Sequence, residues 1–164
     1  MRLGIIMLNY QNIIPAMLDF VPEIRDDYAL MKKECLDGGA LWDAQDYRDM
    51  GSAYTTGKSF EEMHTPDVST VFEDLIVPLI LALSCDAEGS SRLIEIMNWL
   101  EEASADSDVA NAIAVSVCES LITTHVSKIE AIYPYMGKRV RDMCIMQFSE
   151  YHISEATKRI FGVA

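Results

Sequence analysis

Apolar residues that recur every three or four positions are the feature that most constrains how this chain can fold. An α-helix turns about once every 3.6 residues, so this spacing puts the apolar side chains on one face, which must then pack against another element. No strong strand-type alternation appears, although the opening "LGIIML" is ambiguous. We predict an all-α fold, a single domain over residues 1–164 arranged as a helical bundle or short α-solenoid of about six to eight helices. The runs that carry the prediction are Ile24, Tyr28 and Met31; Leu93, Ile96, Met97 and Leu100; and Val140, Cys144 and Phe148.

Helix ends can be predicted from capping residues, prolines and glycines. Gly38-Gly39 should end the helix that starts near residue 22. Thr65 is expected to cap a helix over 65–85, inside which Pro78 should introduce a kink or a division, because proline removes a backbone hydrogen bond. Ser90 or Ser91 is expected to cap the next helix.

The stretch "SADSDVANAIAVSVCESLI" (104–122) is predicted to be an amphipathic helix, with one polar and one apolar half, capped by Asp106 or Ser107. We expect Glu119 to belong to its polar half, so that this carboxylate need not be buried and is not a catalytic acid. The polar half comprises Asp108, Asn111, Ser116, Glu119, Ser120 and Thr123.

Composition is that of a globular chain, because half of its residues are hydrophobic and 24% are charged. The longest apolar run, "LIVPLILAL" (75–83), is too short to span a membrane, and "LGIIML" is too short for a signal peptide. We therefore expect a soluble cytoplasmic protein. Its four cysteines, which form no CxxC pair, are expected to be free and mostly buried.

The formal net charge of −13 is unevenly distributed. Residues 19–108 contain 21 acidic and 6 basic residues, whereas residues 109–164 contain 5 and 6. Such a charge disfavours nucleic acid and anionic membranes as partners and would steer the protein toward a basic partner, although it also promotes solubility.

Motifs for catalysis or metal binding are weak. Glu61 and His64 form a Glu-x-x-His pair, but helical di-iron sites need a second such pair and two further glutamates. Cys118 and His125 are two helical turns apart, too far for contact within one straight helix. We predict no enzymatic activity, no catalytic residues, no metal site and no cofactor. The basic cluster "GKRVRD" (137–142) is expected to pair mainly with the acidic half of the chain.

Residues 37–66 are the least regular part and contain aromatic residues among acids, a combination suited to binding a basic protein surface. An alternative is that the acids form only a solvated face. A calcium loop is excluded, because Asp43, Asp46 and Asp49 lack the required glycine and glutamate. The predicted partner-binding residues are Trp42, Asp43, Asp46, Tyr47, Asp49, Glu61 and Glu62.

A family resemblance extends over roughly residues 70–145. The segments "LIEIMNWLEEASADS", "DVANAIAVSVCESL" and "YPYMGKRVRDMC" resemble the C-terminal half of small acidic helical bacterial proteins. Members of that family resemble the immunity proteins of contact-dependent or secreted polymorphic toxin systems, which neutralise a cognate toxin by binding it. The resemblance rests on helix-packing patterns and carries over no binding residue.

The leading hypothesis is therefore an immunity protein that neutralises a toxin with a basic surface, such as a nuclease, without binding nucleic acid or membrane itself. A second hypothesis is a phage- or plasmid-encoded acidic binding protein, either a nucleic-acid mimic or an inhibitor of a host factor. A third is a helical metal-dependent enzyme. The sequence leaves the oligomeric state open.

Overall fold

The computed structural model describes residues 7–39, 65–86 and 88–163, and within these ranges every regular element is helical, so the all-α prediction is confirmed. Several elements join end to end, giving eight continuous helical segments among the described residues. The elements are α1 (Ile13–Phe20), η1 (Pro22–Ile24), α2 (Arg25–Gly39), α6 (Val68–Val71), η2 (Phe72–Ile76), α7 (Val77–Ser84), α8 (Ser90–Ala103), α9 (Ser107–Ile113), η3 (Ala114–Cys118), α10 (Glu119–Thr123), η4 (Val126–Lys128), α11 (Ile129–Ile132), η5 (Tyr133–Tyr135), α12 (Lys138–Met146), η6 (Gln147–Ser149) and α13 (Glu155–Ile160).

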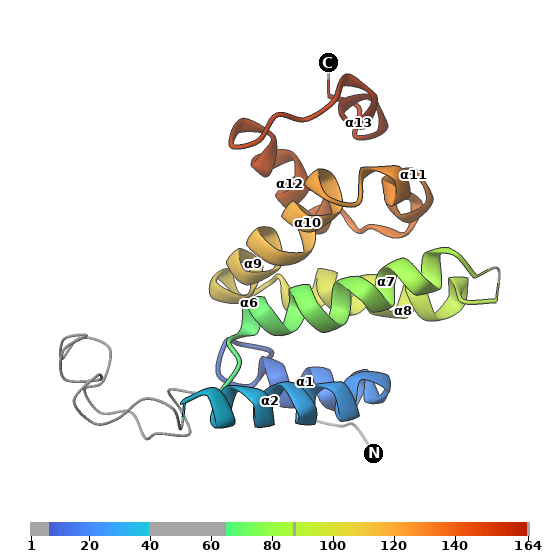
Figure 1. Ribbon diagram of the computed structural model, residues 1–164. Helices are drawn as coiled ribbons and strands as arrows, with labels where there is room; N and C mark the ends of the chain where they lie inside the picture. Colours follow the sequence, from blue (N-terminus) through green and yellow to red (C-terminus); the bar gives the residue numbers. More distant parts are fainter. Residues whose placement is uncertain (1–6, 40–64, 87, 164) are drawn as a thin grey trace.

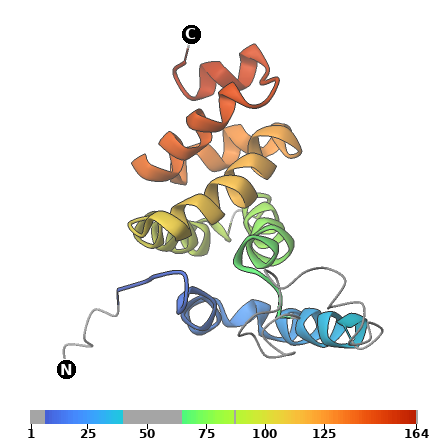
Figure 2. The same cartoon turned by 90° about the vertical axis from the view of Figure 1, so that its left-hand side faces the viewer.

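The helices are stacked in chain order, from α1 and α2 at one end to α13 at the other (Figure 1). The first layer is α1 with α2, and the second is the continuous helix α6–η2–α7 with α8, which runs alongside α7. Helix α9–η3–α10 follows and packs against α12, as a view turned by 90° also shows (Figure 2). This successive stacking corresponds to the short α-solenoid among the predicted alternatives.

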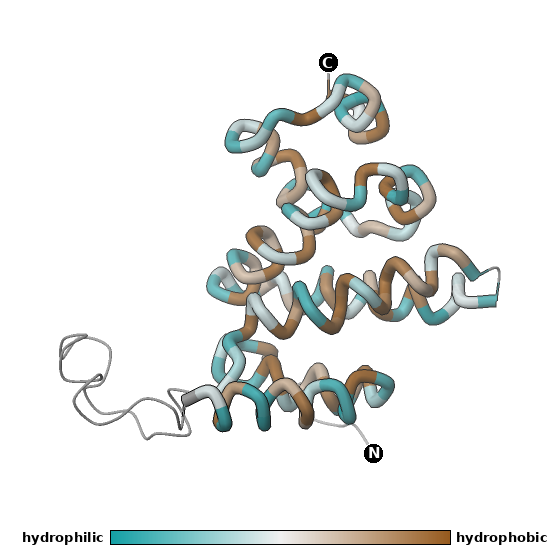
Figure 3. Tube along the Cα trace, viewed as in Figure 1, coloured by the Kyte–Doolittle hydropathy of each residue, from teal (hydrophilic) through white to brown (hydrophobic). Residues whose placement is uncertain are grey.

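Each layer contributes apolar side chains to a shared core, and hydrophobic and hydrophilic residues alternate along the helices (Figure 3). The predicted stripe of Leu93, Ile96, Met97 and Leu100 is at most 1% exposed. Trp99 joins the first two layers. Its ring stacks on that of Phe20, with 5.9 Å between the ring centroids, and makes a T-shaped contact with Phe72, with 6.4 Å between the centroids. The helical periodicity therefore identified the buried face of α8 correctly.

Some helix ends differ from their prediction. The cap of α6 is Asp67 and not Thr65, because the Asp67 carboxylate accepts a hydrogen bond from the backbone N–H of Thr70 at 2.9 Å. Helix α8 has Gly89 at its N-cap position, where we expected Ser90 or Ser91. Pro78 does not divide the helix, because α6–η2–α7 is continuous; it lies at the start of α7, directly after the π-helical turn η2.

In helix α9–η3–α10, two residues of the predicted polar half are buried, so that part of the prediction is wrong. Its cap is Asp106, as expected, but Ser116 and Ser120 are buried, at 1% and 9% exposure. The Ser116 hydroxyl donates to the carbonyl of Ala112, which satisfies it inside the core. Glu119 is only partly buried, and the Tyr151 phenol donates to its carboxylate, which raises the pKa of Tyr151. Glu119 thus lies at the edge of a packed helix.

Candidate functional site

The predicted partner-binding residues lie outside the described part of the chain. Trp42, Asp43, Asp46, Tyr47, Asp49, Glu61 and Glu62 all fall within residues 40–64, as does His64 of the Glu-x-x-His pair. The predicted interface therefore stays a prediction. Of the segment expected to be irregular, residues 37–39 belong to α2.

The second layer contains the strongest acidic imbalance among the described residues. Between residues 65 and 103 the sequence has eight acidic residues and one base, Arg92. Glu73 and Asp74 are exposed side by side on η2. Glu95 and Glu102 are exposed on α8, seven residues apart and thus on the same side of that helix. Seven of the eight carboxylates face solvent: Asp67, Glu73, Asp74, Asp86, Glu88, Glu95 and Glu102.

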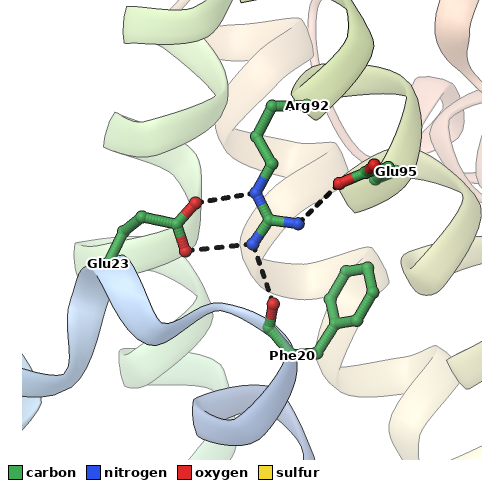
Figure 4. Close-up of polar contacts among 4 residues, drawn as sticks. All are labelled: Phe20, Glu23, Arg92 and Glu95. Carbon is green, nitrogen blue, oxygen red and sulfur yellow. Dashed lines mark hydrogen bonds and ion pairs between the residues drawn. The ribbon is translucent and has the colours of Figure 1, made fainter.

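Arg92 is already engaged within the fold (Figure 4). Its guanidinium donates to both carboxylate oxygens of Glu23, at 2.7 and 3.0 Å, and to Glu95 at 2.8 Å. It also donates to the carbonyl of Phe20 at 2.8 Å and lies 5.1 Å above that ring. These hydrogen bonds lower the pKa of Glu23 and raise the pKa of Arg92, with Glu23 the main cause of the latter shift. Consequently the one base of the second layer pairs with Glu23 of the first layer and, among the seven exposed carboxylates, with Glu95.

The basic cluster is also engaged internally, but only partly as predicted. Lys138 pairs with Asp142 on the same helix, and Arg141 lies over the Tyr133 ring at 4.3 Å. Among the described residues of the acidic half, Glu101 is contacted by Arg139, whose guanidinium donates to its backbone carbonyl at 3.2 Å. The Glu101 carboxylate in turn accepts the backbone N–H groups of Arg139 and Val140, at 2.9 and 3.1 Å, and so caps α12 from a different layer.

Sequence reasoning missed a second candidate site at the end of the α7–α8 hairpin. Cys85, the residue after α7, is exposed, and the Lys128 ammonium lies 3.2 Å from its Sγ. The hydrogen bond from Lys128 lowers the pKa of the Cys85 thiol, and Ser84 contributes in the same direction. An open cavity of about 420 Å³ adjoins this pair, within the range typical of small-molecule sites. Besides Cys85 it is lined by Leu83, Ser84, Asp86, Ser90, Leu93, Ala131 and Tyr135.

The other cysteines differ in their surroundings. All four are free thiols, as expected, but only Cys118 and Cys144 are buried, while Cys35 is partly exposed. The pKa of Cys118 is raised by its contact with Cys144 and by burial, which makes this pair poorly reactive. The prediction of mostly buried thiols is therefore wrong for Cys85.

Residues 7–39, 65–86 and 88–163 contain no group of three or more His, Cys, Asp or Glu side chains placed to hold a metal ion. No single helix there is long and apolar enough to cross a membrane. One pair of segments, Ser107–Thr123 and Val126–Tyr135, has the length and composition but is bent by 83°.

Comparison with known proteins gives no relative from which a function could be transferred. Neither a protein-family model nor a curated protein nor a solved structure matches this chain.

Proposed function

We propose that this protein is an immunity-type binding protein, which neutralises a protein toxin by covering a basic surface of that toxin. The observation that carries the proposal is the second layer, where seven exposed carboxylates face solvent and the one base is held by Glu23 and Glu95. Uncompensated charge of one sign steers an oppositely charged partner and speeds association. The resemblance of residues 70–145 to immunity-type proteins is consistent with this role.

Two acidic surfaces are the candidates for the contact. One is the predicted set around Trp42 and Tyr47, whose aromatic rings would serve as anchors while the acids provide orientation. The other is the second layer, represented by Glu73 and Asp74. We propose that the second layer accelerates the encounter and that the aromatic residues determine how long the complex lasts.

The test begins with the protein encoded beside this gene. We expect its expression to arrest bacterial growth and co-expression of this protein to restore growth. A neighbouring product that is harmless, or one that stays toxic in the presence of this protein, would contradict the immunity role. Capture of a DNA-binding protein or another host factor in place of a toxin would support the acidic-mimic hypothesis instead.

Charge variants then locate the surface. One variant combines Glu73→Gln with Asp74→Asn, and a matched control neutralises two exposed carboxylates of the later layers, Glu130→Gln with Glu150→Gln. We expect the first variant to lower the association rate about 3- to 10-fold at low salt, with little difference remaining near 0.3 M salt, because added ions screen exposed charges. The control should change it less than about twofold. Equal effects of both variants would indicate only a general charge effect and would reject the second layer as the contact surface.

The aromatic anchors need a different readout. Trp42→Ala is expected to increase the dissociation rate of the complex at least about tenfold, with an association rate that changes little. Replacing Asp43, Asp46 and Asp49 with asparagine should weaken affinity and reduce its dependence on salt. If neither changes the complex, the predicted interface at residues 42–49 is wrong, whatever the result for the second layer.

A further inference from the structure

The pair formed by Cys85 and Lys128 has no part in the proposed binding role, although Cys85 directly precedes Asp86 of the acidic second layer. The two residues are 43 positions apart and are brought together because η4 lies near the end of the α7–α8 hairpin. Both side chains are exposed, so solvent and small reagents can reach the sulfur. A reactive cysteine is distinguished by this combination of access and a neighbouring cation, since the thiolate is the nucleophile.

The backbone around Cys85 does not itself favour a thiolate. Cys85 occupies the C-cap position of α7, where the partial negative charge of the helix end opposes a second negative charge. The Asp86 carboxylate is the next residue and adds to this opposition. The Lys128 ammonium at 3.2 Å is therefore the group that makes an anionic sulfur favourable at this position.

The adjoining cavity supplies room for a group attached to the sulfur. Its lining includes Ser84, Ser90 and Tyr135, which carry hydroxyl groups, and Leu93 and Ala131, which are apolar. A short chain with a polar end would find both kinds of contact there. Neither buried cysteine has comparable access, because Cys118 and Cys144 are fully buried.

We propose that Cys85 is a site of reversible S-thiolation, at which its thiolate, held beside Lys128 at the edge of this cavity, exchanges with low-molecular-weight disulfides. In the exchange the Cys85 sulfur attacks one sulfur of the disulfide, a new S–S bond forms and the original S–S bond breaks. The other half of the reagent leaves as a thiolate and takes up a proton from solvent. Cys85 is oxidised and the leaving half is reduced, so a free thiol reverses the reaction.

The test uses the full chain and 2-hydroxyethyl disulfide, a neutral reagent whose approach is insensitive to the net charge of the protein. Mass spectrometry of peptides gives the rate at each cysteine, and Cys35 on α2 serves as the internal reference. We expect Cys85 to react at least about fivefold faster than Cys35, and Lys128→Gln to slow Cys85 at least about threefold while Cys35 is unchanged. Lys128→Arg should restore part of the rate.

Lys158→Gln is the matched control, since Lys158 is paired with Glu155 on α13, and it should leave the rate at Cys85 unchanged. A Cys85 that reacts no faster than Cys35, or that is unaffected by Lys128→Gln, would overturn the proposal. The role of the cavity is tested by Ala131→Phe, which should slow the disulfide but leave the smaller reagent iodoacetamide within about twofold. If Ala131→Phe lowered the reaction rates of both reagents equally, the attached group would not occupy the cavity.

Discussion

Arg92 fastens the first layer to the second, so its replacement tests how the layers hold together. The guanidinium donates to Glu23 through two bonds, to the Phe20 carbonyl and to Glu95 (Figure 4). Lysine keeps the positive charge, but it has a compact ammonium in place of the planar guanidinium and cannot reach all three groups at once. We expect Arg92→Lys to destabilise the protein although the charge is unchanged.

The size of the loss follows from the exposure of each partner. The charge-assisted bond to the Phe20 carbonyl is partly buried and contributes about 1.5 kcal/mol. The pair with Glu23, whose side chain is 42% exposed, contributes about 1 kcal/mol after solvent screening, and the pair with Glu95, at 58% exposure, about 0.3 kcal/mol. Since lysine retains roughly one contact, Arg92→Lys should lower the free energy of unfolding by about 2 kcal/mol and Arg92→Met by about 3 kcal/mol.

Urea denaturation followed by far-UV circular dichroism measures this loss, with Arg159→Lys, at an exposed position of α13, as the control. Amide hydrogen exchange gives a local readout, because loosening of the first layer should speed exchange in α1 more than in α8. An Arg92→Lys protein within about 0.5 kcal/mol of wild type would refute the reasoning. So would unchanged protection of α1, which would show that apolar packing alone holds the layers together.

Three further predictions test the cross-layer contacts and the core. Arg92 holds the pKa of Glu23 below its ordinary value of 4.5, so this pair stabilises the fold above pH 4.5. Its contribution to the free energy of unfolding is lost as the pH falls through the lower pKa of the folded state. Arg92→Met should lose less stability over that pH range than the wild type does. Gly137→Ala should cost about 1 kcal/mol, because the new Cβ would lie within 2.7 Å of the Glu101 Cγ and displace the carboxylate that caps α12. In a Glu101→Ala background the same change should cost nearly nothing in urea denaturation, since the φ of Gly137 is −71°. Leu100→Ala, in the core at 0% exposure, should cost about 3 kcal/mol in the same assay.

The fold class could be predicted because the spacing of apolar residues within one helix is enough to identify the face of that helix that is buried. Ile96 and Leu100 were assigned to the core on this basis and are fully buried. Ser116 could not be placed in this way, because a serine that donates to the carbonyl four residues earlier is satisfied without solvent. The π-helical turn η3 around it also departs from the regular rotation per residue on which the projection relies.

The candidate sites were harder to predict, because they depend on which layers lie next to each other. Arg92 and Glu23 are 69 positions apart, and Lys128 and Cys85 are 43 apart. Periodicity contains no information about such pairings. A cysteine among apolar residues at the end of a helical run was expected to be buried, yet Cys85 lies just past the last turn of α7 and is exposed.

The acids of the second layer divide into those that the fold uses and those that it does not. Glu101 caps α12 and Glu95 binds Arg92, so removal of either weakens the structure. Glu73 and Asp74 have no comparable use in the described fold, and neighbouring like charges destabilise a compact state through repulsion. Their neutralisation should therefore leave the free energy of unfolding unchanged or raise it, while association with a basic partner slows. Opposite effects on stability and association would show that these carboxylates serve binding, and a matched loss of both would show that they serve the fold.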